Sequence, residues 1–78
     1  SLTKPEYVKF AITKTNSGSS QVGFDNQNFI LHETLIPAVH KFMREELVNM
    51  KNTPSLLDDS GNLVILLDLY NHQAIELV

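Results

Sequence analysis

Cysteine is missing from this chain of 78 residues. Its absence excludes disulfide bridges, thiolate metal ligands and a cysteine nucleophile, and we expect a cytoplasmic location. Glycine is also scarce, with three isolated residues at positions 18, 23 and 61, so the chain lacks a glycine-rich phosphate-binding loop. We expect no signal peptide and no membrane-spanning segment, because no apolar run reaches the length that a bilayer requires.

Positive charge is sparse and scattered. Six lysines and arginines stand against nine aspartates and glutamates, which gives a net charge of −3. The longest runs of like charge include the acidic pairs Glu45-Glu46 and Asp58-Asp59. Surfaces that follow phosphate backbones or anionic lipid headgroups need clustered positive charge, so we expect neither nucleic acid nor a membrane as a direct partner.

The rest of the composition indicates one folded domain. Hydrophobic residues make up 42% of the chain, which is typical of a globular protein rather than a disordered one. Charged residues make up 19%, below the usual value of about 25%, so less of the surface is covered by charge. We therefore expect a single domain, residues 1–78, with a partly apolar face available to a partner.

The first half of the chain predicts a β-hairpin. From Tyr7 to Thr13, apolar and polar positions alternate, which is the pattern of a strand with one buried face. The serine- and glycine-rich segment 16–20 predicts a loop, and residues 21–24 predict a second strand antiparallel to the first. Asp25 and Asn26 are expected to end that strand, because both residue types tolerate left-handed backbone and form turns.

A helix is the clearest prediction for the middle of the chain. Pro37 fits its first turn, where a missing N–H costs no hydrogen bond, with Thr34 as the N-cap. Pro54 sets its end near Asn52, because the residue before a proline avoids helical backbone. The apolar positions that recur at steps of three and four residues, and that predict the buried face, are Ile36, Val39, Met43, Leu47 and Met50.

The C-terminal stretch allows two interpretations. Residues 63–70 are almost entirely apolar and follow a turn signal at 58–62, so we interpret them as a central strand buried on both faces. A turn at 71–73 and a last strand at 74–78 follow. Periodicity does not separate a strand from a helix in such a run. The residues that would share one face of the alternative helix are Leu63, Leu66, Leu67, Tyr70, Ala74, Leu77 and Val78.

The predicted elements follow the order β-β-α-β-β. We predict an α+β fold in two layers, in which one amphipathic helix packs on a mostly antiparallel sheet. In topology alone, this order resembles the β-grasp arrangement of ubiquitin-like domains.

Three histidines, His32, His40 and His72, are the candidate metal ligands. His32 and the glutamate after it begin like a zinc-protease motif, but Ile36 stands where the second histidine belongs. Pro37 lies between His32 and His40, and two ligands so far apart do not readily close one tetrahedral site. We therefore expect no metal.

The acidic stretch 58–62 has two further interpretations. A calcium loop needs a glutamate at its twelfth position, where Leu69 or Tyr70 stands, so we predict a turn there and no cofactor. Asp59-Ser60 resembles the Asp-Ser attachment site of acyl and peptidyl carrier domains, which implies an all-helical fold and attachment at Ser60. The leucine that normally follows the serine in those domains is replaced here by Gly61.

No arrangement of residues for catalysis stands out. Thr15 and the serines at 17, 19 and 20 lie in a predicted loop, and the chain has no Gly-x-Ser-x-Gly elbow. Adjacent carboxylates such as Glu45-Glu46 point apart on a helix. We therefore predict that the chain is not an enzyme.

The function that remains is a protein-interaction module. We predict docking through a sheet edge or a helix face, with a protein partner or by self-association. Residues 22–24 are the predicted open edge, and burial in the core is the alternative for the aromatic rings. Two different functions are also consistent with the sequence: a small structural subunit of a viral or other large assembly, and a regulatory domain cut from a larger protein. The predicted partner-binding residues are Tyr7, Val22, Phe24 and Phe29.

Overall fold

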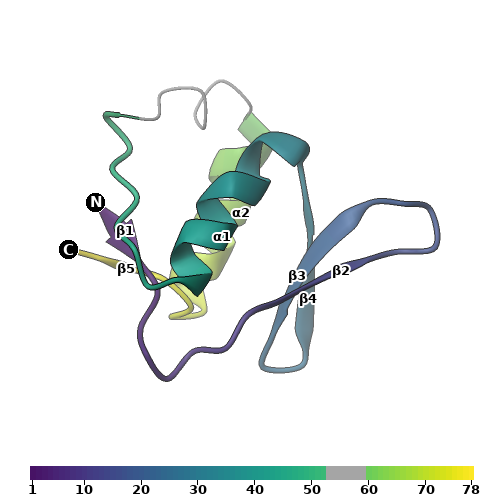
Figure 1. The fold of residues 1–78 in the computed structure, drawn as a ribbon, viewed down its shortest axis with the longest axis horizontal. Helices are drawn as coiled ribbons and strands as arrows, with labels where there is room; N and C mark the ends of the chain where they lie inside the picture. Colours follow the sequence, from purple (N-terminus) through teal and green to yellow (C-terminus); the bar gives the residue numbers. More distant parts are fainter. Residues whose placement is uncertain (53–59) are drawn as a thin grey trace.

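Five short strands form two separate antiparallel sheets in the computed structural model, which describes residues 1–52 and 60–78 (Figure 1). The smaller sheet pairs β1 with β5, and the larger sheet has the order β2-β3-β4. The strands are β1 (Leu2–Thr3), β2 (Ala11–Lys14), β3 (Ser20–Phe24), β4 (Gln27–Leu31) and β5 (Glu76–Leu77).

Two α-helices and one short 3-10 helix lie between the sheets. The 3-10 helix η1 (Glu33–Leu35) leads directly into α1 (Ile36–Met43), and α2 (Ser60–Asn71) follows later in the chain. Figure 1 shows the two sheets toward opposite ends of the longest axis, which measures 34 Å. The fold is therefore α+β, with two antiparallel sheets and two α-helices, and not the single β-β-α-β-β sandwich that the sequence predicted. The resemblance in topology to β-grasp domains is lost with that order.

The N-terminal hairpin confirms the alternating pattern in part. Val8 is buried, Phe10 and Ile12 are half-buried, and the intervening side chains are exposed. Strand β2 nevertheless begins at Ala11 rather than Tyr7, and it pairs antiparallel with β3 as predicted. The sequence missed β4, which continues the sheet beyond the predicted turn at 25–26.

The turn between β3 and β4 explains why the sheet gains a third strand. Asp25 and Asn26 have φ angles of 50° and 64°, and Phe24 and Gln27 face each other across the turn. Two successive left-handed residues form a turn whose twist matches that of an antiparallel pair. These two residues therefore reverse the chain into another strand rather than only ending β3.

Helix α1 is shorter than its apolar pattern predicted. Pro37 lies in its first turn as expected, but the helix ends at Met43 and not near Asn52, and His32 rather than Thr34 caps η1. Glu45 adopts a left-handed φ of 60°. The amide of Glu45 donates to the Phe42 carbonyl, and the amide that follows donates to the Lys41 carbonyl, both at 2.9 Å. This hydrogen-bond pair is a Schellman motif, which ends a helix.

Residues 63–70 are helical, so their interpretation as a central strand is wrong. Helix α2 covers Ser60–Asn71 and buries Asn62, Leu66 and Leu69 along one face. Part of the predicted turn at 58–62 thus lies inside this helix, whereas residues 58 and 59 fall outside the described part of the chain. The predicted turn at 71–73 is confirmed for residues 72 and 73, because Asn71 still belongs to α2. The last strand, predicted at 74–78, is confirmed only as β5 at Glu76–Leu77.

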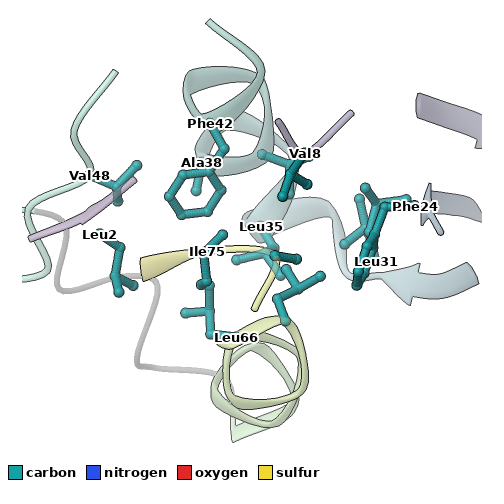
Figure 2. Packing of buried hydrophobic residues seen from close by; sticks show 14 residues of the cluster. Leu2, Val8, Phe24, Leu31, Leu35, Ala38, Phe42, Val48, Leu66 and Ile75 are labelled. Atoms are coloured by element: carbon teal, nitrogen blue, oxygen red, sulfur yellow. The ribbon is translucent and has the colours of Figure 1, made fainter. Parts of the chain in front are cut away.

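One cluster of buried apolar side chains joins both sheets and both helices. Phe42, Leu35, Leu69 and Ile75 are among its largest members, and each is at most 2% exposed. Figure 2 shows labelled members of the cluster from α1, α2 and the strands facing a common centre. Burial of a large apolar side chain contributes about 1.5–3 kcal/mol, so this cluster is the main force that holds the helices and sheets together.

Lys4 is an unusual component of this interior, because it is only 6% exposed. Its ammonium group donates to the carbonyl oxygens of Pro5 at 2.8 Å and Val8 at 2.6 Å. The carboxylate of Glu45 lies 3.8 Å away. A buried charge requires such partners, and here they fix the segment that leads from β1 to β2 against the end of α1.

Helix α2 also ends in a Schellman motif, and we expect a stabilising substitution there. Exposed Gln73 has a φ of 62°; its amide donates to the Tyr70 carbonyl, while the Ala74 amide donates to the Leu69 carbonyl. Left-handed backbone costs a residue with a Cβ about 1–2 kcal/mol, and glycine avoids this cost in the folded state. Glycine also makes the unfolded chain more flexible, which offsets part of the stabilisation. Gln73→Gly should therefore raise the free energy of unfolding by about 0.5–1 kcal/mol. Urea denaturation measures this change, and a fall in stability would contradict the assignment.

Candidate functional site

The four residues predicted to bind a partner lie in different surroundings. Tyr7 is 77% exposed, whereas Val22 is fully buried, Phe24 is 8% exposed and Phe29 is half-buried. Strand β3 is the middle strand of its sheet, paired with β2 on one side and β4 on the other. The prediction that residues 22–24 form an open edge is therefore wrong, and only Tyr7 of the four is well exposed.

Two of the predicted residues instead belong to an aromatic cluster. The rings of Phe24 and Phe29 stack with centroids 5.6 Å apart, and Phe10 meets Phe24 edge to face at 5.8 Å. His72, just after α2, lies 5.7 Å from Phe29 and 6.2 Å from Phe24. Such contacts add to area burial. The cluster therefore joins the three-stranded sheet to the end of α2, and Phe24 is a core residue.

The surface with the most exposed apolar side chains belongs to α2 and the strand after it. Helix α2 carries apolar residues around its whole circumference, and a helix of that kind is normally buried on all sides. Here Leu63, Val64 and Leu67 remain 46–56% exposed, and Tyr70 remains 44% exposed. In β5, Leu77 is 68% exposed. The covered face of α2 is therefore only part of its apolar surface.

An apolar groove of about 230 Å³ runs between α2 and the β1–β5 sheet. Among the described residues that line it, none carries a charge, and the Tyr70 hydroxyl is the only polar side-chain group. Because such a lining offers no group for electrostatic recognition, it suits apolar side chains. The residues that line it are Leu2, Met50, Leu63, Leu66, Leu67, Tyr70, Ile75 and Leu77.

Sequence reasoning missed this groove because it treated α2 as a strand. The helical interpretation contained the signal, since Leu63, Leu66, Leu67, Tyr70 and Leu77 all belong to both its apolar face and the groove lining. In the structure, much of that face lines the groove, and the core receives the face that carries Asn62, Leu66 and Leu69.

The polar side chains near the start of α2 hold the fold together. The Asn62 amide nitrogen donates to the Thr34 hydroxyl at 2.7 Å, and the Thr34 amide donates to His32 Nδ1 at 3.4 Å. The Thr34 hydroxyl also lies 3.0 Å from His32 Nδ1. These contacts cap η1 and attach α2 to it, so the histidine and hydroxyl have a structural role.

Metal and carrier chemistry receive no support from the described residues. Within 1–52 and 60–78, no three histidine, aspartate or glutamate side chains lie close enough to hold a metal ion. Ser60 does begin a helix, but Asp59 lies outside the described residues, and the three-stranded sheet contradicts the all-helical fold of carrier domains.

Comparison with known proteins identifies no relative. No model of a known protein family matches the chain, and neither does any curated protein or solved structure. In the described part of the chain, no helix has the length and apolar character needed to cross a membrane. The class of the protein therefore has to be inferred from the groove and the surfaces around it.

Proposed function

We propose that this chain is a non-catalytic protein-interaction module whose docking surface is the apolar groove between α2 and β5. The observation that supports this proposal most directly is the uncovered apolar face of α2, on which Leu63, Leu67 and Tyr70 are about half exposed. Exposed apolar residues are ordinary when they are scattered, but a contiguous concave set is typical of a binding surface. The proposal retains the predicted helix-face docking and moves it from the sheet edge at 22–24 to this groove.

A protein partner fits the groove better than other ligand classes. The chain has a net charge of −3, and no lysine or arginine is among the described residues that line the groove, so these residues offer a nucleic acid or an anionic lipid no electrostatic attraction. Hot spots of protein interfaces are enriched in aromatic residues, and Tyr70 provides one beside the five leucines of the lining. A cytoplasmic location belongs to the same proposal, because a cysteine-free domain needs no oxidising compartment.

Leu67→Lys tests the proposal, with Val64→Lys as its matched control. Both positions are exposed surface sites of α2, at 51% and 56%, but only Leu67 lines the groove, whereas Val64 contacts a separate hollow beside Ile30. Each variant should keep its stability within about 0.5 kcal/mol. Peptides are selected from a random displayed library on sparsely immobilised wild-type domain, and their affinities are measured by fluorescence anisotropy.

We expect Leu67→Lys to weaken the selected peptides by about tenfold or more, because a charge would be buried in an apolar contact. Val64→Lys should leave their affinities within about threefold of the wild type. The proposal fails if no peptide is selected, or if both lysine variants bind as tightly as the wild type.

A further inference from the structure

The backbone N–H and C=O of Leu77 both lie on the outer edge of β5, the edge that faces away from β1. Leu2 in β1 exchanges hydrogen bonds with Val48 on its other side, at 2.8 and 2.7 Å, and it faces Leu77 across the β1–β5 ladder. Because the N–H and C=O of Leu2 point toward Val48, the pair Leu2–Leu77 is a non-hydrogen-bonded pair. The N–H and C=O of Leu77 therefore point away from β1, and no other strand of the described residues pairs with that edge.

We infer that the partner of the groove is a second copy of this chain, joined by antiparallel pairing of β5 with β5 across a two-fold axis at Leu77. This inference rests on the proposed function, because it names the occupant of the same surface. Two residues that face each other in a hydrogen-bonded antiparallel pair exchange both bonds. The N–H and C=O of Leu77 both point outward, so Leu77 of one copy can exchange both hydrogen bonds with Leu77 of the other. An isologous interface requires this kind of self-complementary surface. The result is a continuous sheet of β1-β5-β5-β1.

The same pairing brings the apolar side chains of the two copies together. Directly opposed residues of an antiparallel pair project from the same face of a sheet. Leu77 of the second copy would therefore lie on the face that already carries Leu2 and Leu77, above the groove. Glu76, whose side chain points to the opposite face, would stand across from Val78 of the second copy. No two charged side chains face each other in the ladder, and the described residues that line the groove carry no charge.

The exposed area on this face is enough for a dimer of modest affinity. Leu63, Leu67, Tyr70 and Leu77 are 44–68% exposed, which leaves on the order of 100 Å² accessible on each. A two-fold dimer would then bury about 800 Å² of this side-chain surface in total, which is typical of a weak and reversible interface. We therefore expect a dimer that dissociates on dilution, rather than an obligate one.

Proline at position 77 tests the pairing directly. Both hydrogen bonds of the proposed pair use the N–H of Leu77, one from each copy, so Leu77→Pro removes both. The pairing of Leu77 with Leu2 uses no hydrogen bond, and the Val78 amide keeps its bond to the Ser1 carbonyl at 2.9 Å. Leu77→Val is the matched control, because valine keeps the N–H, an apolar side chain and a high strand propensity.

Sedimentation velocity of the untagged chain, from low to high micromolar concentration, is the measurement. We expect the wild type to shift from monomer to dimer, Leu77→Val to follow it within about threefold in dissociation constant, and Leu77→Pro to weaken dimerisation by more than about tenfold. The amide of Leu77 should also become protected from hydrogen exchange as concentration rises, which reports the pairing even if Leu77→Pro fails to fold.

A wild type that stays monomeric at all concentrations overturns the inference, and so does a dimer in which the Leu77 amide gains no protection. Neither result touches the proposed function, which is tested separately by peptide binding that depends on Leu67. Conversely, a dimer that is weakened by Leu77→Pro but unaffected by Leu67→Lys would overturn the claim that the two copies meet over the groove.

Discussion

Phe24→Ala is expected to lower the free energy of unfolding by about 3–5 kcal/mol, the usual cost of truncating a buried phenylalanine. A domain of this length has a total stability of about 4–12 kcal/mol, so the substitution would remove much of it. The ring is 8% exposed and contacts the rings of Phe10, Phe29 and His72. Its loss would leave a cavity at the junction between the three-stranded sheet and the end of α2.

Tyr7→Ala is the control for this prediction. Tyr7 was predicted alongside Phe24 as a partner-binding residue, but it is 77% exposed, so its truncation should change stability by no more than about 0.5 kcal/mol. Urea denaturation of both variants distinguishes an aromatic anchor for a partner from an aromatic core residue. Similar stabilities for the two variants would mean that Phe24 is not part of the core.

Val22→Pro is expected to unfold the three-stranded sheet. Val22 is fully buried in the central strand and faces Ile12 on one side and Phe29 on the other. The N–H of Val22 faces either β2 or β4, and proline at this position has no N–H to donate. A carbonyl on that neighbouring strand would therefore lose its hydrogen bond and remain buried without a donor. We expect a loss of about 3 kcal/mol or more in the free energy of unfolding, measured by thermal or urea denaturation.

The comparison of two proline variants makes this prediction specific. Leu77→Pro places the same residue in an edge strand, at a position whose N–H points outward, and should leave the monomer folded. If Val22→Pro also left the monomer folded, the order β2-β3-β4 would be wrong and residues 22–24 would again be candidates for an open edge.

The sequence predicted well where periodicity or turn chemistry was strong. The alternation around Val8 and Phe10 correctly separated buried from exposed side chains. Asp25 and Asn26 correctly marked a turn, and Pro37 correctly marked the start of α1. Each of these signals is local, because it depends on the backbone preference of one or two residues or on the two faces of a single strand.

The errors have physical causes that the sequence does not display. Helix α1 ends where Glu45 adopts left-handed backbone, a position that glycine usually marks, so the apolar positions beyond it seemed to continue the helix. Residues 63–70 are apolar except for Asp68, so no period separates a helix from a strand. Because residues 63–70 were interpreted as a strand buried on both faces, no exposed apolar surface was expected there, and the groove was not predicted.

The placement of β1 between Val48 and β5 also orders the steps of folding. The hairpins of β2-β3-β4 join residues close in sequence and can form in microseconds, whereas Leu2 and Leu77 are separated by nearly the whole chain. Closing so long a loop costs entropy before its contacts offset the cost, so the β1–β5 ladder should form last. The strand edge that we assign to self-association would then be absent from partly folded chains, and only molecules that have completed folding would pair through it.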